Sequence, residues 1–284
     1  MHNNKPVIAL AMAASAALSV LLSPSAQAAT VSPPADLSTW TCTGNCGAMA
    51  AAGDVVASPL NNPKYGYVTT FNSSSTGVSP LALDANNRGD GTETNGSKFV
   101  SSSFSVQAND QLNIQFNYVS TDGKGYDDYA WARLVNASDN SFVAWLFTAR
   151  SSNSATGNIV PGDVVSKKDF DPDVTITNYK DFVFTSKTTA DPINWAPLGD
   201  SNGTCWSDNA PGCGFTGWLQ SSHTFASGGS FKLEIGVTNW GDGAYDSGLA
   251  FDYQNLNAAN LAPVPEPSAY AMLLAGLGLL GIFI

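Results

Sequence analysis

Aspartate provides most of the side chains that could do chemistry in this sequence. Two Gly-rich loops, residues 121–128 and 239–248, concentrate it. Calcium binds about six to eight hard oxygens, which carboxylates and the carbonyls of such turns can supply. If the two loops meet at one end of the fold, four aspartates could converge on one structural calcium ion, a hypothesis that names Asp127, Asp128, Asp246 and Asp252 as ligands. The alternative interpretation is that these loops are solvated turns, because Asp and Asn are good turn formers.

Residues for the common hydrolytic mechanisms are sparse. His2 falls in the N-terminal leader and His223 is the other histidine, so mechanisms built on paired histidines are excluded, and we interpret His223 as an ordinary strand residue. The sequence has no Gly-x-Ser-x-Gly nucleophile motif, phosphate loop or dinucleotide fingerprint. A glycosidase needs two carboxyls about 5–9.5 Å apart, one of them protonated, and no Asp here lies in an apolar stretch that would keep it neutral. We therefore predict that the protein is not an enzyme.

The tryptophans are the second group of side chains that could have a function, in this case sugar binding. A pyranose ring has one apolar face and a rim of hydroxyls, so sugar sites combine an exposed aromatic ring with Asp or Asn. Trp206 and Trp240 lie beside such residues in loops. They are the best candidates among the tryptophans for exposure and for glycan binding, although burial is the usual state of any one tryptophan. Trp131 and Trp145 fall within expected strands and are predicted to be core residues.

The four cysteines form two closely spaced pairs, Cys42 with Cys46 and Cys205 with Cys213. Three pairings are open to four cysteines, and the two local disulfides are the most economical of them in an oxidising compartment. The rival interpretation, a zinc site of four thiolates, fits poorly because the spacings match no common zinc pattern. We predict two disulfides that fasten loops and add modest stability.

The elements that must position these residues have a period of two. Apolar and polar residues alternate over 112–118, 129–134, 231–237 and 249–253, and 142–148 is a compact apolar stretch. Clusters of Asn, Asp, Ser and Gly separate them, as expected of turns. This pattern predicts an all-β fold, an antiparallel β-sandwich of the jelly-roll-like type, over residues 29–262.

Two regions of the body alternate less clearly. Residues 151–214 are rich in Pro, Asp and Asn, and we expect long, partly structured loops between the strands of one sandwich. Residues 30–54 are expected to form an entry arm that its disulfide fastens.

The N-terminal residues, 1–28, have the pattern of a secretory signal peptide. Lys5 precedes an apolar stretch, 7–22, which is followed by Pro24 and by an Ala-Gln-Ala site at 26–28. This order of charge, apolar segment, helix breaker and small-residue site predicts cleavage after export. The alternative, a retained membrane helix, fits the proline and the cleavage site less well.

The C-terminal residues, 263–284, combine a Pro-rich spacer with an uncharged run. The run, 269–284, would give a helix of about 24 Å, shorter than a hydrocarbon core of about 30 Å. The segment Val264, Pro265, Glu266, Pro267 and the apolar helix after it resemble the PEP-CTERM sorting signal of Gram-negative bacteria. Signals of that family end in a short Arg/Lys cluster, and none follows here.

This resemblance implies an exported protein that an exosortase recognises and processes. It also implies membrane anchoring through the tail before processing and a later location at the cell surface or in the extracellular matrix.

Charge limits the partners of the body. The net charge is −11 and only 12% of residues are charged. The negative net charge therefore excludes nucleic acid and anionic membrane surfaces as partners. The low fraction of charged residues also shows that this protein is not a highly charged disordered chain. We predict a structural or adhesive, non-catalytic role at the envelope or in the matrix. The alternative is a carbohydrate-binding module for extracellular polysaccharide, and a hydrolase of extracellular polymer is the third hypothesis.

Overall fold

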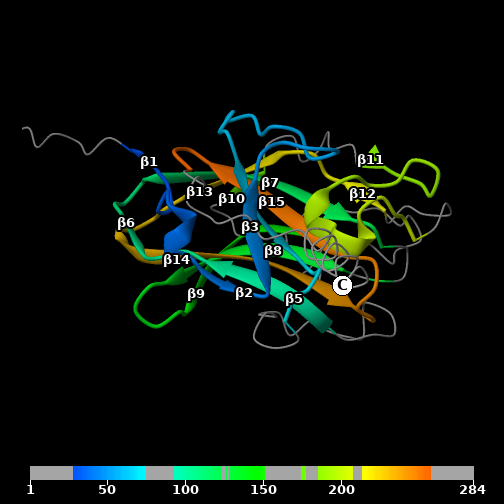
Figure 1. Ribbon diagram of the computed structural model, residues 1–284. Coiled ribbons are helices and arrows are strands. Elements are labelled where there is room, and N and C mark those ends of the chain that lie inside the picture. Colours follow the sequence, from blue (N-terminus) through cyan, green and yellow to red (C-terminus); the bar gives the residue numbers. More distant parts are fainter. Residues whose placement is uncertain are drawn as a thin grey trace, which may run out of the picture.

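The strands form two sheets that face one another as a sandwich. The computed structural model describes residues 28–74, 93–122, 126, 128–150, 174–176, 185–206 and 213–256. In Figure 1 the sheet that contains β7, β13 and β15 forms the upper layer, and the sheet that contains β14, β8 and β9 forms the lower one. This confirms the predicted all-β antiparallel sandwich. The predicted leader up to residue 27 and the predicted tail lie outside the described residues.

The first sheet holds nine strands among the described residues. Its main path runs in the order β10, β13, β7, β15, β4, β3, while β1 and β12 also pair with β7, and β11 pairs with β12. All pairs are antiparallel except β1 with β7. The strand bounds are β1 Thr30–Val31, β3 Asn45–Met49, β4 Tyr65–Thr69, β7 Gln111–Ser120, β10 Val174–Ile176, β11 Thr185–Ser186, β12 Gly214–Phe215, β13 Leu219–Thr224 and β15 Ser247–Tyr253.

The second sheet holds six strands in the same part of the chain, ordered β2, β5, β14, β8, β9, with β6 also on β14. All its pairs are antiparallel. Its strand bounds are β2 Thr41–Thr43, β5 Glu93–Val100, β6 Phe104–Val106, β8 Tyr129–Asn136, β9 Phe142–Arg150 and β14 Gly229–Trp240. The four strands expected from alternation are therefore present, as β7, β8, β14 and β15, and the apolar stretch forms β9.

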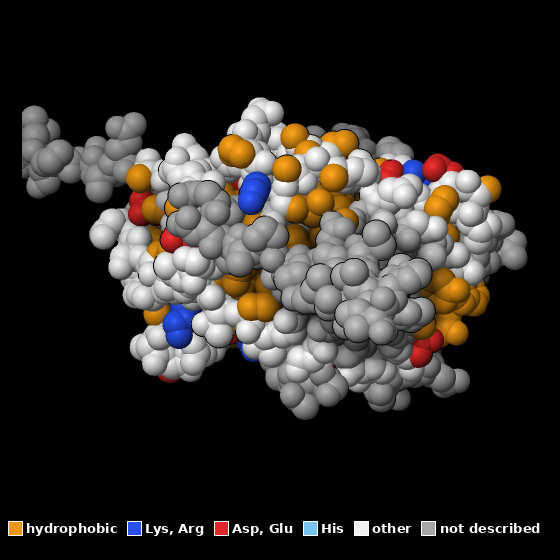
Figure 2. Space-filling view, in the orientation of Figure 1, with side chains coloured by type: hydrophobic (Ala, Val, Ile, Leu, Met, Phe, Trp, Pro, Cys, Tyr) orange, Lys and Arg blue, Asp and Glu red, His pale blue; other side chains and the backbone are white. Residues whose placement is uncertain are grey.

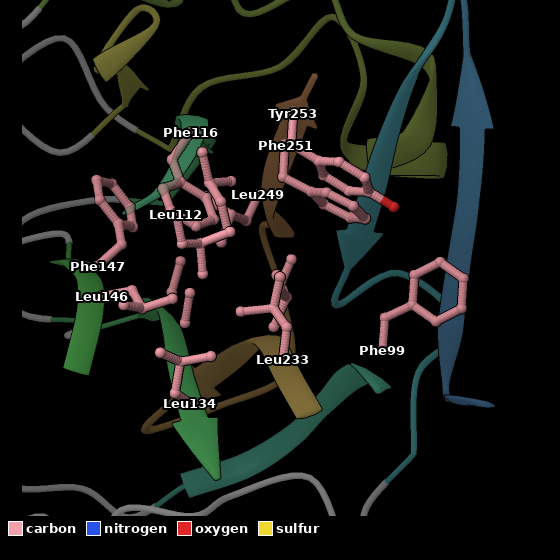
Figure 3. Close-up of a cluster of buried hydrophobic side chains, with 14 of the residues drawn as sticks. Phe99, Leu112, Phe116, Leu134, Leu146, Phe147, Leu233, Leu249, Phe251 and Tyr253 are labelled. Carbon is pink, nitrogen blue, oxygen red and sulfur yellow. The ribbon is translucent and has the colours of Figure 1, made fainter. Parts of the chain in front are cut away.

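The main hydrophobic core fills the space between the two sheets. Figure 3 shows side chains of both sheets pointing toward one another across this space. Phe116 of β7 stacks on Phe147 of β9, with 4.8 Å between ring centroids and 20° between ring planes. The strands alternate because every second side chain enters this core.

A second core covers the outer face of the first sheet. Trp195 is buried there, and its Nε1–H donates to the hydroxyl of Tyr65 on β4 at 2.8 Å. It occupies the N-cap position of a 3-10 helix, η4 (Ala196–Ser201), that lies over the sheet. Part of the region predicted as partly structured loops is therefore packed against the sandwich, through the buried side chains of Ile193, Trp195, Leu198 and Cys205.

The entry arm connects the two sheets. Its elements are β1, a 3-10 helix η1 (Leu37–Thr39), β2 and β3. The chain leaves the second sheet with β2, turns at Gly44 in the left-handed region (φ 86°) and enters the first sheet with β3. The Cys42–Cys46 disulfide spans this corner, and Cys205–Cys213 is the other disulfide. Both pairings match the prediction.

Candidate functional site

Asp128 ties the two Asp-bearing loops together. It is fully buried before β8, where one carboxylate oxygen accepts a hydrogen bond from the Trp240 backbone N–H at 2.8 Å and the other accepts from the Ser247 hydroxyl at 2.7 Å. Burial raises its pKa well above the ordinary value, and the negative charge of Asp122 raises it further. The loops therefore meet at one end of the sandwich, as the calcium hypothesis requires.

Asp246 lies next to this junction and is also buried. Its carboxylate accepts hydrogen bonds from the Thr70 hydroxyl at 2.8 Å and from the Ser201 hydroxyl at 2.9 Å. Burial raises its pKa, and these two hydrogen bonds act in the opposite direction. The carboxylate thus fastens the end of β4 and the end of η4 to the loop before β15.

Asp252 lies elsewhere, so the proposed set of four ligands does not come together. On β15 it pairs with Gln115, whereas Ser247 pairs with Ser120. Five residues of strand separate it from the junction by roughly 16 Å. Its carboxylate instead accepts from Ser58 and from Asn62. Asp127 lies outside the described residues, and among those described no group of three or more His, Cys, Asp or Glu side chains could hold a metal ion.

The two candidate glycan-binding tryptophans differ in exposure. The predicted exposure of Trp240 is wrong, because it is the last residue of β14, pairs with Glu93 and is only 2% exposed. Trp206 is 41% exposed, as predicted, and its ring meets the ring of Tyr126 edge-on at 5.7 Å. Trp131 is buried, as expected, on the outer face of the second sheet.

Trp145 and His223 occupy strand positions. Trp145 is half-buried on β9, where it meets Trp131 edge-on, so the expectation of a core position holds only in part. His223 is buried on β13 with its ring against Phe225, which agrees with the interpretation as a strand residue.

A polar cleft of about 530 Å³ opens beside Asp246. The end of β4, the start of β5, η4 and the β14–β15 loop form its walls. Its lining includes the polar or aromatic side chains Asn72, Asn95, Asp200, Ser201, Tyr245 and Asp246. Sequence reasoning missed this cleft, because its walls come from segments up to 176 positions apart in the chain.

Two lining residues of the cleft have an unusual backbone. Asn72 (φ 50°) and Tyr245 (φ 58°) both lie in the left-handed region. Asn tolerates this region, whereas a bulky residue such as Tyr rarely adopts it and needs support from the surrounding structure. Here the hydrogen bonds of Asp246 supply that support, since its backbone N–H also donates to the Ser201 hydroxyl at 2.9 Å.

The C-terminal segment matches a known sorting motif. A family model, the PEP-CTERM protein-sorting motif, matches residues 263–284. The chain matches no curated protein and no solved structure. In the described part of the chain, no helix has the length and apolar character needed to cross a membrane.

Proposed function

We propose that this exported protein, sorted by an exosortase through the PEP-CTERM motif at residues 263–284, has a non-catalytic structural or adhesive role at the cell surface or in the extracellular matrix. The observation that carries the proposal is the sorting motif on a sandwich with two local disulfides. A disulfide-bonded domain with a surface-sorting motif suits a protein that must persist outside the cell.

Further support for the proposal comes from the packing of the body. Apolar side chains are buried between the sheets and again on the outer face of the first sheet. Disulfides form and persist in the oxidising compartments that export would provide. On the face shown in Figure 2, acidic and basic side chains lie scattered among neutral ones, which limits electrostatic attraction to anionic partners.

The proposal is tested by attachment of the producing cells. A strain that lacks the protein should attach less to a surface or form a weaker matrix than the wild type. Complementation with the wild-type chain should restore attachment, while a chain with Pro265→Ala, Glu266→Ala and Pro267→Ala should be exported without restoring it. Equal attachment in all strains would reject an adhesive role. Release of reducing ends from the producer's purified polysaccharide would reject the non-catalytic part.

Carbohydrate binding is the second candidate function. The observation that favours it is the exposed ring of Trp206, which lies beside the half-buried ring of Tyr126 and could stack on the apolar face of a sugar ring. A polysaccharide pull-down should weaken with Trp206→Ala. Phe142→Ala is the matched control, because Phe142 is similarly exposed (47%). Phe142 begins β9 and pairs with the far end of β8, whereas Asp128 precedes the start of β8, so the control lies away from the loop junction. Equal loss in both variants would show only nonspecific adhesion.

A further inference from the structure

We infer that the polar cleft beside Asp246 is a binding site for neutral sugar residues. The inference rests on the carbohydrate-binding candidate and adds to it a site and a ligand class. The cleft volume of about 530 Å³ lies within the range of about 300–1,000 Å³ that is usual for small-molecule sites. It therefore has room for a sugar residue together with bridging water.

Three lining side chains are available to a ligand. Within the described part of the chain, Asn72, Asp200 and Tyr245 make no side-chain hydrogen bond, although all three line the cleft. A carboxylate accepts from sugar hydroxyls, an amide both donates and accepts, and a tyrosine offers a ring face and a hydroxyl. By contrast, Asn95 is engaged: its amide donates to the Ser73 hydroxyl at 2.8 Å and to the Thr70 carbonyl at 3.2 Å.

The cleft is fixed in shape before any ligand enters. The Asp246 carboxylate holds Thr70 on one wall and Ser201 on another, and Tyr245 is its chain neighbour. The left-handed backbone of Tyr245 is therefore held by buried hydrogen bonds on the adjacent residue. A preorganised site loses less conformational freedom on binding, which favours affinity for a small polar ligand.

The exposed Trp206 belongs to a segment that lies close to the cleft. The backbone N–H of Trp206 donates to the Thr121 carbonyl at 3.0 Å, and the Thr121 hydroxyl donates to the Asp246 carbonyl at 2.9 Å. Thr204, two residues before Trp206, lines the cleft itself. A chain of several sugar residues could therefore occupy the cleft and extend over the ring of Trp206.

Charge selects the ligand class. Asp200 and Asp246 both line the cleft, and its lining includes neither Lys nor Arg among the described residues. A uronic acid or a sulfated or phosphorylated sugar would bring a negative charge toward these carboxylates and toward a chain of net charge −11. Hydroxyls of a neutral hexose can donate to the Asp200 carboxylate without this repulsion.

The inference is tested by affinity electrophoresis of the full chain through gels that contain dextran, galactomannan or alginate. We expect at least one of the two neutral polymers to retard the protein and alginate not to. The affinity for the polymer, obtained from the retardation at several polymer concentrations, should decrease about tenfold in each of three cleft variants: Asp200→Asn, Asn72→Gly and Tyr245→Asn. Gly and Asn tolerate the left-handed backbone at the last two positions, so the loss of the side chain is separated from backbone strain. Thermal melting verifies that each variant is folded, and Phe142→Ala should bind like the wild type.

The outcomes distinguish the site from the function. In one outcome, a neutral polymer retards the wild-type protein, Trp206→Ala abolishes the retardation, and all three folded cleft variants bind normally. The cleft is then not the binding site, and the carbohydrate-binding candidate stands. If none of the polymers retards the wild-type chain, both are overturned. Retardation by alginate as strong as that by a neutral polymer would overturn the ligand class.

Discussion

Removing the Cys42–Cys46 disulfide should destabilise the corner where the chain passes from one sheet to the other. The two residues are four positions apart. The chain-entropy relation for a loop of this size gives about 2 kcal/mol of stabilisation at 25 °C. For a domain of about 150–250 residues, 1 kcal/mol corresponds to roughly 2–4 °C in Tm, so Cys42→Ser with Cys46→Ser should lower Tm by about 4–8 °C.

Calorimetry of the purified protein with and without a thiol reductant measures this effect. Without reductant, the double variant should have a lower Tm than the wild type. Adding reductant should lower the Tm of the wild type by more than that of the variant, because only the Cys205–Cys213 disulfide remains in the variant. That second bridge spans eight positions and should contribute about 2.5 kcal/mol by the same relation. A Tm of the double variant within about one degree of the wild type would refute the claim that the first disulfide constrains the unfolded chain.

Two further predictions concern the core and the loop junction. Phe116→Ala should lower the free energy of unfolding by about 3–5 kcal/mol in urea denaturation, because it leaves a cavity against Phe147; a loss below about 1 kcal/mol would contradict the described core. Because burial raises the pKa of Asp128, the native state binds the carboxyl proton more tightly than the unfolded chain does. The contribution of this group therefore lowers the free energy of unfolding as the pH rises above the ordinary carboxyl pKa. The Tm of Asp128→Asn minus that of the wild type should therefore increase between pH 4 and pH 8, and a constant difference would contradict the buried, raised-pKa carboxyl.

The strands that were predicted from the sequence have apolar side chains facing the main core, and the prediction fails where polar residues are buried. On β13 the residues on the core side include Ser221 and His223, which give no apolar alternation. Ser221 is tolerated there because its hydroxyl donates to the Leu146 carbonyl of the other sheet at 2.6 Å. All five residues of β4 are buried, since cores lie on both of its faces, so a period of two is absent there as well.

The candidate site was predictable only in part. The Asp-bearing loops are local features, and their meeting at Asp128 follows from the antiparallel arrangement of neighbouring strands. The burial of Trp240 depends on how far β14 extends along β5, which the Gly- and Asp-rich sequence around it does not reveal. The cleft combines Asn72, Asp200 and Tyr245, and only the three-dimensional packing brings these distant positions together.

Mass spectrometry of the protein recovered from the cell surface tests the central claim most directly. Sorting through the PEP-CTERM motif predicts a mature chain that has lost the apolar residues after Pro267, with both disulfides formed. A chain that still ends at Ile284, recovered from the cytosol with all four thiols reduced, would contradict export and sorting together.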